Sequence, residues 1–118
     1  PGGCLFVAAA IELDDQPGPM RDRLVALQKD WLDALAHAVR VAIDEGHFRA
    51  DVDPMQFAHD LNAIALGYHW SSRLMRDPRA DERAVKAFEA LVAAARKTPL
   101  PARKSPPARA ARPRPRAS

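Results

Sequence analysis

The chain has 118 residues, of which 47% are hydrophobic, with one cysteine and a formal net charge of +3. This length accommodates one domain with one modest core, and the lone Cys4 excludes an internal disulfide framework and fits a reducing, cytoplasmic setting. No apolar run approaches the roughly 20 residues that span a bilayer, so we expect no membrane segment and no membrane partner.

The positive charge is concentrated at the C-terminal end. Residues 97–118 contain seven Lys and Arg residues and no acid, whereas residues 1–96 contain eleven basic and fifteen acidic residues, a net charge of −4. The high pI therefore belongs to the tail and does not indicate a basic face on the folded part. Because the sequence begins at Pro1 rather than at Met, we interpret it as a fragment or a processed piece.

The first predicted helix runs roughly from Cys4 to Leu13. The flexible pair Gly2-Gly3 precedes it, and Asp14-Asp15 ends it before the turn at Pro17–Pro19. Its residues are apolar on nearly every side. Such a helix is expected to be central rather than superficial.

The second predicted helix is long and one-faced, from about Pro19 to Glu45. Proline suits a first-turn position, and Gly46 is available as a left-handed cap. Apolar residues recur at steps of three and four, which indicates a one-faced amphipathic helix. The stripe contains Met20, Leu24, Leu27, Trp31, Leu35, Ala38 and Ala42.

The third predicted helix begins with a capping signal. Asp53 is the expected N-cap, Pro54 takes the first helical position, and Gln56 is placed to reach back in a capping-box arrangement. We expect the helix to run to about Arg76, because Asp77-Pro78 stops it.

Two separate apolar stripes distinguish this third helix. One stripe contains Phe57, Leu61, Ile64, Tyr68 and Met75. The other stripe contains Leu66, Trp70 and Leu74. One chain of this size has too little material to cover both, so we expect a second subunit to cover one of them. Which stripe faces the partner stays open.

The fourth predicted helix, roughly Ala80 to Lys97, is rich in alanine, which lets neighbouring helices approach closely. One side of it presents Ala84, Phe88, Leu91, Val92 and Ala95. With the third helix it predicts a helix-to-helix homodimer, commonly a twofold contact. From Thr98 onward proline alternates with arginine, alanine and serine, which predicts a disordered basic tail. The expected organisation is therefore a helical domain over residues 1–97 and a tail over residues 98–118.

The stretch GGCLFVAAAIELDDQPGPMRD, residues 2–22, resembles one that is common in TetR/AcrR-family transcriptional regulators. There a glycine–cysteine step opens a core helix, and a short acid-Pro-Gly turn leads into the long next helix. Later segments agree with the same family: Gly46 and its extended connector, Asp53-Pro54, the ending Arg73–Pro78 and the final alanine-rich helix. The resemblance covers about residues 2–97.

The resemblance implies an all-α fold and a regulatory function. Members of that family carry an N-terminal three-helix head with a helix-turn-helix, followed by helices that form a ligand pocket and a dimer interface. The four helices here would be the last four, with the third and fourth pairing in a four-helix dimer bundle. Nothing in the sequence reads as a helix-turn-helix, so operator DNA would be reached only through an N-terminal head missing from this chain. We therefore expect a ligand-sensing and dimerising domain of a repressor that a small, largely apolar effector releases from DNA.

Candidate ligand-binding residues are apolar or aromatic, because effector pockets are mostly apolar with a few polar anchors. They are Phe6, Trp31, Leu35, Leu61 and Tyr68. Tyr68 is the best polar anchor, since a buried hydroxyl needs a partner. The alternative, that all five are ordinary core residues, stays open.

Candidate dimer-interface residues come from the second stripe of the third helix and from the fourth helix. They are Leu66, Trp70, Leu74, Phe88, Leu91, Val92 and Ala95. Aromatic residues at the centre of an interface often dominate its energy. Packing within the monomer is the alternative interpretation of the same residues.

Catalytic and metal-binding roles find little support in the sequence. The four histidines, His37, His47, His59 and His69, lack the spacing of a metal site, so we expect no metal and no cofactor. Cys4 has no neighbouring base in the sequence that would activate its thiol as a nucleophile, so we expect that the chain is not an enzyme. The remaining alternative is a freestanding helical dimerising protein that holds nucleic acid non-specifically through its basic tail.

Overall fold

The computed structural model describes residues 4–98 and shows an all-helical fold, which confirms the expected fold class. The elements are α1 (Leu5–Leu13), α2 (Pro19–Asp44), α3 (Pro54–His69), the π-helical turn η1 (Trp70–Leu74) and α4 (Ala80–Ala95). No strand occurs within the described residues. The Gly2-Gly3 pair and residues 99–118 of the expected tail lie outside the described residues.

The helix ends follow local chemistry. The Asp53 carboxylate accepts hydrogen bonds from the backbone N–H groups of Met55 (3.0 Å) and Gln56 (3.2 Å), which confirms the N-cap of α3. The expected capping box is wrong, because the Gln56 side chain donates forward to Asp60 Oδ1 at 2.9 Å instead of back toward Asp53. After α2, Gly46 adopts φ +78°, the left-handed conformation that favours glycine.

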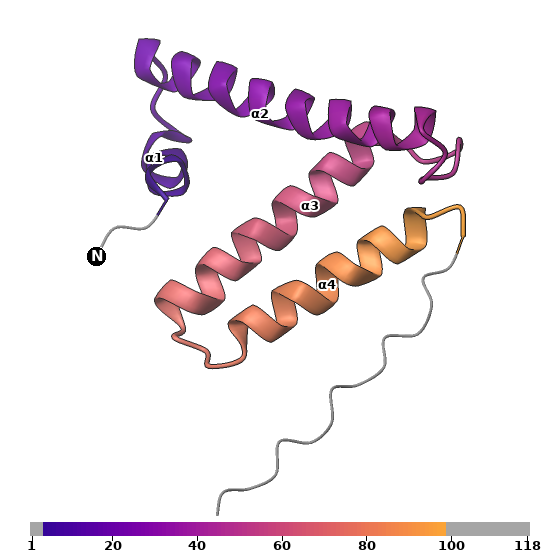
Figure 1. The fold of residues 1–118 in the computed structure, drawn as a ribbon. Coiled ribbons are helices and arrows are strands. Elements are labelled where there is room, and N and C mark those ends of the chain that lie inside the picture. The colour runs from indigo at the N-terminus through magenta and orange to yellow at the C-terminus, as the bar shows by residue number, and fades with distance from the viewer. Residues whose placement is uncertain (1–3, 99–118) are drawn as a thin grey trace, which may run out of the picture.

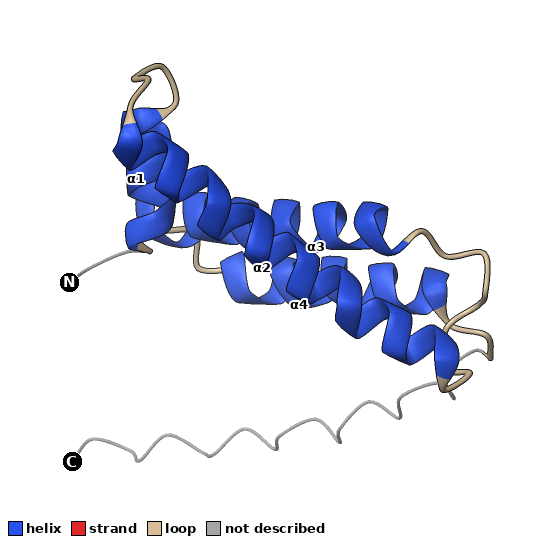
Figure 2. Cartoon of the chain, turned by 90° about the horizontal axis from the view of Figure 1, so that it is seen from above, coloured by secondary structure: helices blue, strands red, loops and turns tan. Residues whose placement is uncertain are grey.

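The four helices form a flat layer rather than a compact ball. Figure 1 shows α3 and α4 running antiparallel, with α2 lying across the start of α3 and α1 beside the start of α2. Figure 2 shows the same arrangement from above. The fold measures 69 × 41 × 15 Å, so its thinnest dimension is close to the diameter of one or two helices. Most helices therefore keep an uncovered side.

The core lies at one end of this layer, where the end of α2, the start of α3 and the end of α4 meet. Val39, Phe57 and Ala95 are buried there, and the rings of Phe48 and Phe57 lie 5.4 Å apart. Half-buried neighbours pack against this core cluster: Ile43, Phe48, Val52, Leu61, Leu91 and Val92.

The connector between α2 and α3 holds the end of α4 in place. Phe48 and Arg96 form an isolated antiparallel bridge, and the Arg49 N–H donates to the Ala95 carbonyl at 2.9 Å. The Arg49 guanidinium also donates to the Ala94 carbonyl. The last carbonyls of a helix lack partners within the helix, so Arg49 satisfies groups that would otherwise depend on water.

Two expectations about the helices need correction. We expected α1 to be central, but it contacts mainly α2, and its Leu5 and Ile11 side chains are 77% and 70% exposed. Its apolar outer sides have no covering element within the described residues. The third helix is not α-helical to Arg76: regular geometry ends at His69, and the chain continues as the π turn η1 to Leu74. Sequence periodicity carries no signal for a π turn.

Candidate functional site

A large cavity of about 1000 Å³ lies between α1, the first half of α2 and the second half of α3 with η1. Figure 1 shows the path of the helices at this end: α2 and α3 meet near the start of α3 and diverge toward α1. The lining residues are Cys4, Phe6, Val7, Ala10, Leu27, Gln28, Asp30, Trp31, Asn62, Ala65, Leu66, Tyr68, His69, Ser72 and Arg73.

The walls of the cavity differ in chemistry. The α1 wall is apolar apart from the Cys4 thiol, and α2 adds Leu27 and Trp31 together with Gln28 and Asp30. The wall formed by α3 and η1 carries most of the polar groups, interleaved with Ala65 and Leu66. A mostly apolar cavity with a few polar groups is the usual form of a small-molecule site.

The structure brings three of the five candidate ligand residues together. Phe6, Trp31 and Tyr68 line the cavity from three different helices. Leu61 instead packs against the core cluster, and Leu35 is half-buried outside the cavity lining.

The sequence prediction missed the polar lining residues because apolar and aromatic side chains are the usual lining of an effector pocket. Asn62 and His69 stand seven residues apart on α3, which is two helical turns and therefore one face. Two polar residues at that spacing in an apolar helix are a signal that identifies such a wall.

Tyr68 connects the cavity to α4. Its side chain lines the cavity, while a hydrogen bond to the Asp81 carboxylate of α4 raises the pKa of its hydroxyl above the ordinary value. The expected role of Tyr68 as a polar anchor therefore has a competitor, because its hydroxyl already has a partner inside the chain.

The π turn η1 separates two kinds of side chain. The Met75 N–H donates to the Trp70 carbonyl at 3.2 Å, five residues back, and the Ser72 hydroxyl donates to the Tyr68 carbonyl at 2.7 Å. Ser72 and Arg73 line the cavity, whereas Trp70 and Leu74 do not line it and are largely exposed. π turns occur frequently at functional sites.

The seven interface candidates lie in three different environments. Trp70, Leu74 and Phe88 remain exposed, and we call these three residues the outer apolar set. Leu91 and Val92 are half-buried against the core cluster, and Ala95 is only 4% exposed within it. Leu66 is exposed but lines the cavity. Part of the predicted interface is therefore occupied by packing within one chain.

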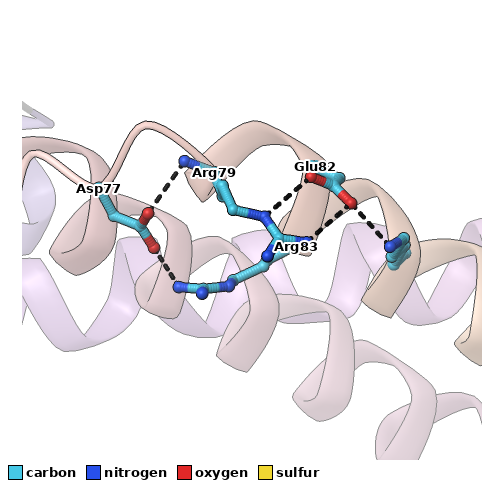
Figure 3. A network of polar contacts seen from close by, with 5 residues as sticks. Asp77, Arg79, Glu82 and Arg83 are labelled. Carbon is cyan, nitrogen blue, oxygen red and sulfur yellow. Dashed lines mark hydrogen bonds and ion pairs between the residues drawn. The ribbon is translucent and has the colours of Figure 1, made fainter.

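A polar network fixes the turn that leads from η1 into α4 (Figure 3). Asp77 accepts from the Arg79 backbone N–H at 2.9 Å and pairs with Arg83. Glu82 accepts from the Arg79 guanidinium at 3.1 Å and from Lys86 Nζ at 2.7 Å. Hydrogen bonds from Arg79 and Lys86 lower the pKa of Glu82 to about 2. These contacts hold the first two turns of α4 beside the cavity wall.

The described part of the chain contains neither a metal-binding cluster nor a membrane-spanning helix. Across residues 4–98, no three His, Cys, Asp or Glu side chains gather as a metal ion would require. None of the helices from α1 to α4 combines the length and apolar composition needed to cross a membrane.

Comparison with known proteins identifies relatives of this fold. Residues 1–88 match the family model described as "Tetracyclin repressor-like, C-terminal domain". The fold is similar to the crystal structure of a TetR-family transcriptional regulator from Cytophaga hutchinsonii, with a TM-score of 0.76 and 23% sequence identity. That similarity covers 82% of this chain and 48% of the other, so this chain spans about half the length of that regulator. No curated protein sequence matches the chain.

Proposed function

The chain belongs to the tetracyclin repressor-like C-terminal domain family, and on this basis we propose that it is the ligand-sensing and dimerising domain of a transcriptional repressor. Its work is binding rather than catalysis. A small, largely apolar effector occupies the cavity, and the domain transmits that occupancy to DNA-reading heads outside this chain.

One observation carries the proposal. The segment that forms the polar wall of the cavity, from Asn62 to Arg73, also contains Trp70, which is exposed outside the cavity. A change in this segment on ligand binding therefore reaches the outer surface directly, without a long chain of intermediates.

A second copy of the chain covers the outer apolar set in this proposal. Trp70 and Leu74 lie on η1, Phe88 lies on α4, and these two elements are in contact. Exposed apolar side chains on adjacent elements commonly mark an interface, and identical chains usually pair about a twofold axis.

Tyr68 supplies a route from the cavity to α4. A ligand that forms a hydrogen bond with the Tyr68 hydroxyl competes with Asp81 for it. Because Asp81 lies in the first turn of α4, losing this partner affects the start of that helix. The effector must bind one dimer arrangement more tightly than the other, because equal affinity for both leaves their populations unchanged. The spacing of paired recognition helices then changes relative to successive major grooves of DNA.

The cavity is tested with the neutral fluorescent probe N-phenyl-1-naphthylamine. We expect the wild-type domain to bind it with enhanced emission, and Ala65→Trp to weaken binding at least about tenfold because the larger side chain narrows the cavity. The matched control is Ala34→Trp, an exposed position on α2 outside the cavity lining, which should bind like wild type. Absence of binding to wild type, or equal binding by Ala65→Trp, contradicts the proposal.

A further inference from the structure

Some polar side chains that line the cavity have a hydrogen-bond partner within the chain, and others have none within the described residues. The Tyr68 hydroxyl is engaged by Asp81, and the Ser72 hydroxyl donates to the Tyr68 carbonyl. The side chains of Asn62, His69 and Arg73 form no hydrogen bond or ion pair with any residue in 4–98. Three side chains that can donate hydrogen bonds therefore remain available on one wall.

Arg73 and Arg76 both lack an ion pair within residues 4–98, and of these two arginines only Arg73 lines the cavity. Arg79 is paired with Glu82 and Arg83 with Asp77. Arg73 has no such carboxylate within the described residues, although it lines a largely apolar cavity. A guanidinium beside an apolar cavity gains most from an anionic partner, which it binds with two parallel hydrogen bonds.

The opposite wall carries the opposite charge. Asp30 of α2 lines the same cavity, and no ion pair joins it to Arg73. An acid group is repelled at the α2 wall and attracted at the wall of α3 and η1. The charges of the cavity therefore favour one orientation of a ligand with a single acid group.

We propose that the effector is an amphipathic organic anion, with its apolar body against Phe6, Trp31 and Leu66 and its acid group on Arg73. His69 and Asn62 are placed along the same wall to donate further hydrogen bonds. This inference rests on the proposed function of the cavity and adds the chemical class of its ligand.

Two dyes that share one apolar body isolate the acid group. 8-Anilinonaphthalene-1-sulfonate carries a sulfonate that N-phenyl-1-naphthylamine lacks. We expect Arg73→Gln to weaken the sulfonate dye at least about tenfold and to change binding of the neutral dye less than about twofold. Arg23→Gln removes the same charge from an exposed position on α2 outside the cavity lining and should leave both titrations unchanged.

A second variant tests the orientation. Asp30→Asn removes the repelling carboxylate, so the sulfonate dye should bind as tightly as to wild type or more tightly. A loss of sulfonate binding in Asp30→Asn would contradict the assigned orientation.

The outcomes separate this inference from the proposed function. If both dyes bind wild type and Arg73→Gln weakens neither, the anion assignment is overturned while the cavity remains a ligand site. If Arg73→Gln loses both dyes, Arg73 supports the end of the helix, where a cation also complements the helix dipole, and the inference is overturned. If wild type binds neither dye, the inference and the proposed function fail together.

Discussion

Replacing Trp70 with alanine tests the proposed pairing of two chains. The Trp70 side chain is 58% exposed in one chain. An aromatic side chain of this size buries up to about 250 Å², so about 140 Å² is left for a partner to cover. At about 25 cal/mol per Å², complete burial of this Trp70 surface by a partner contributes up to about 3.5 kcal/mol to the free energy of dimerisation.

The expected loss of dimerisation free energy is smaller than this for each chain, but a twofold dimer loses it at two positions. Alanine keeps the β-carbon, and ordering the indole at an interface offsets part of the gain. We therefore expect about 2 kcal/mol per chain and about 4 kcal/mol per twofold dimer, which is roughly a thousandfold rise in the dimer dissociation constant.

Sedimentation equilibrium over a range of protein concentrations measures this change. The control is Met20→Ala, which removes an even more exposed side chain from the first turn of α2, away from α4. We expect the control to associate like wild type. Equal dissociation constants for wild type and Trp70→Ala would refute the assignment of Trp70 to the interface.

Three further predictions concern stability. Asp53→Ala removes the acceptor of two backbone N–H groups at the start of α3, so urea denaturation should show a loss of about 1 kcal/mol; no loss would show that the cap is dispensable. Arg49→Met keeps the aliphatic stem but leaves the carbonyl of Ala94 without this donor, which should cost about 1 kcal/mol in the same assay, and an unchanged midpoint would contradict the closure described for α4. Glu82 has a folded-state pKa of about 2 against an ordinary 4.5, so its contribution is fully present above about pH 4.5 and is lost as the pH falls toward 2. Glu82→Gln should therefore lose less stability than wild type between pH 5 and pH 2.5, and identical pH profiles would argue against the lowered pKa.

Local signals in the sequence were sufficient to predict the helices. Proline at the first position, Asp53 as an N-cap and Gly46 after the long helix fix ends that depend only on neighbouring residues. The one-faced pattern of α2 predicted the helix but not its buried residues, because Ala36 and Val39 lie outside the predicted stripe, whereas Met20 within it is 74% exposed.

Features that depend on how the helices cross could not be predicted from a single sequence. The two stripes of α3 were identified, but the angle between α2 and α3 decides which residues enter the core and which line the cavity. Leu61 packs against the core cluster, whereas Leu66, five residues farther along the same helix, lines the cavity. An apolar pattern cannot distinguish these two environments.

The same limit explains the misplaced first helix. An apolar helix is expected in the centre of a domain, but α1 keeps Leu5 and Ile11 exposed in a layer only 15 Å thick. The apolar pattern of α1 therefore does not indicate which of its sides another helix covers.

Mapping amide chemical shifts during a titration with N-phenyl-1-naphthylamine tests the sensing cavity most directly. We predict that the perturbed amides belong to α1, to the first half of α2 and to residues 62–73, which together enclose the cavity. Perturbations confined to Val85 and Phe88 of α4, or no perturbation at saturating dye, would contradict a ligand site between these helices.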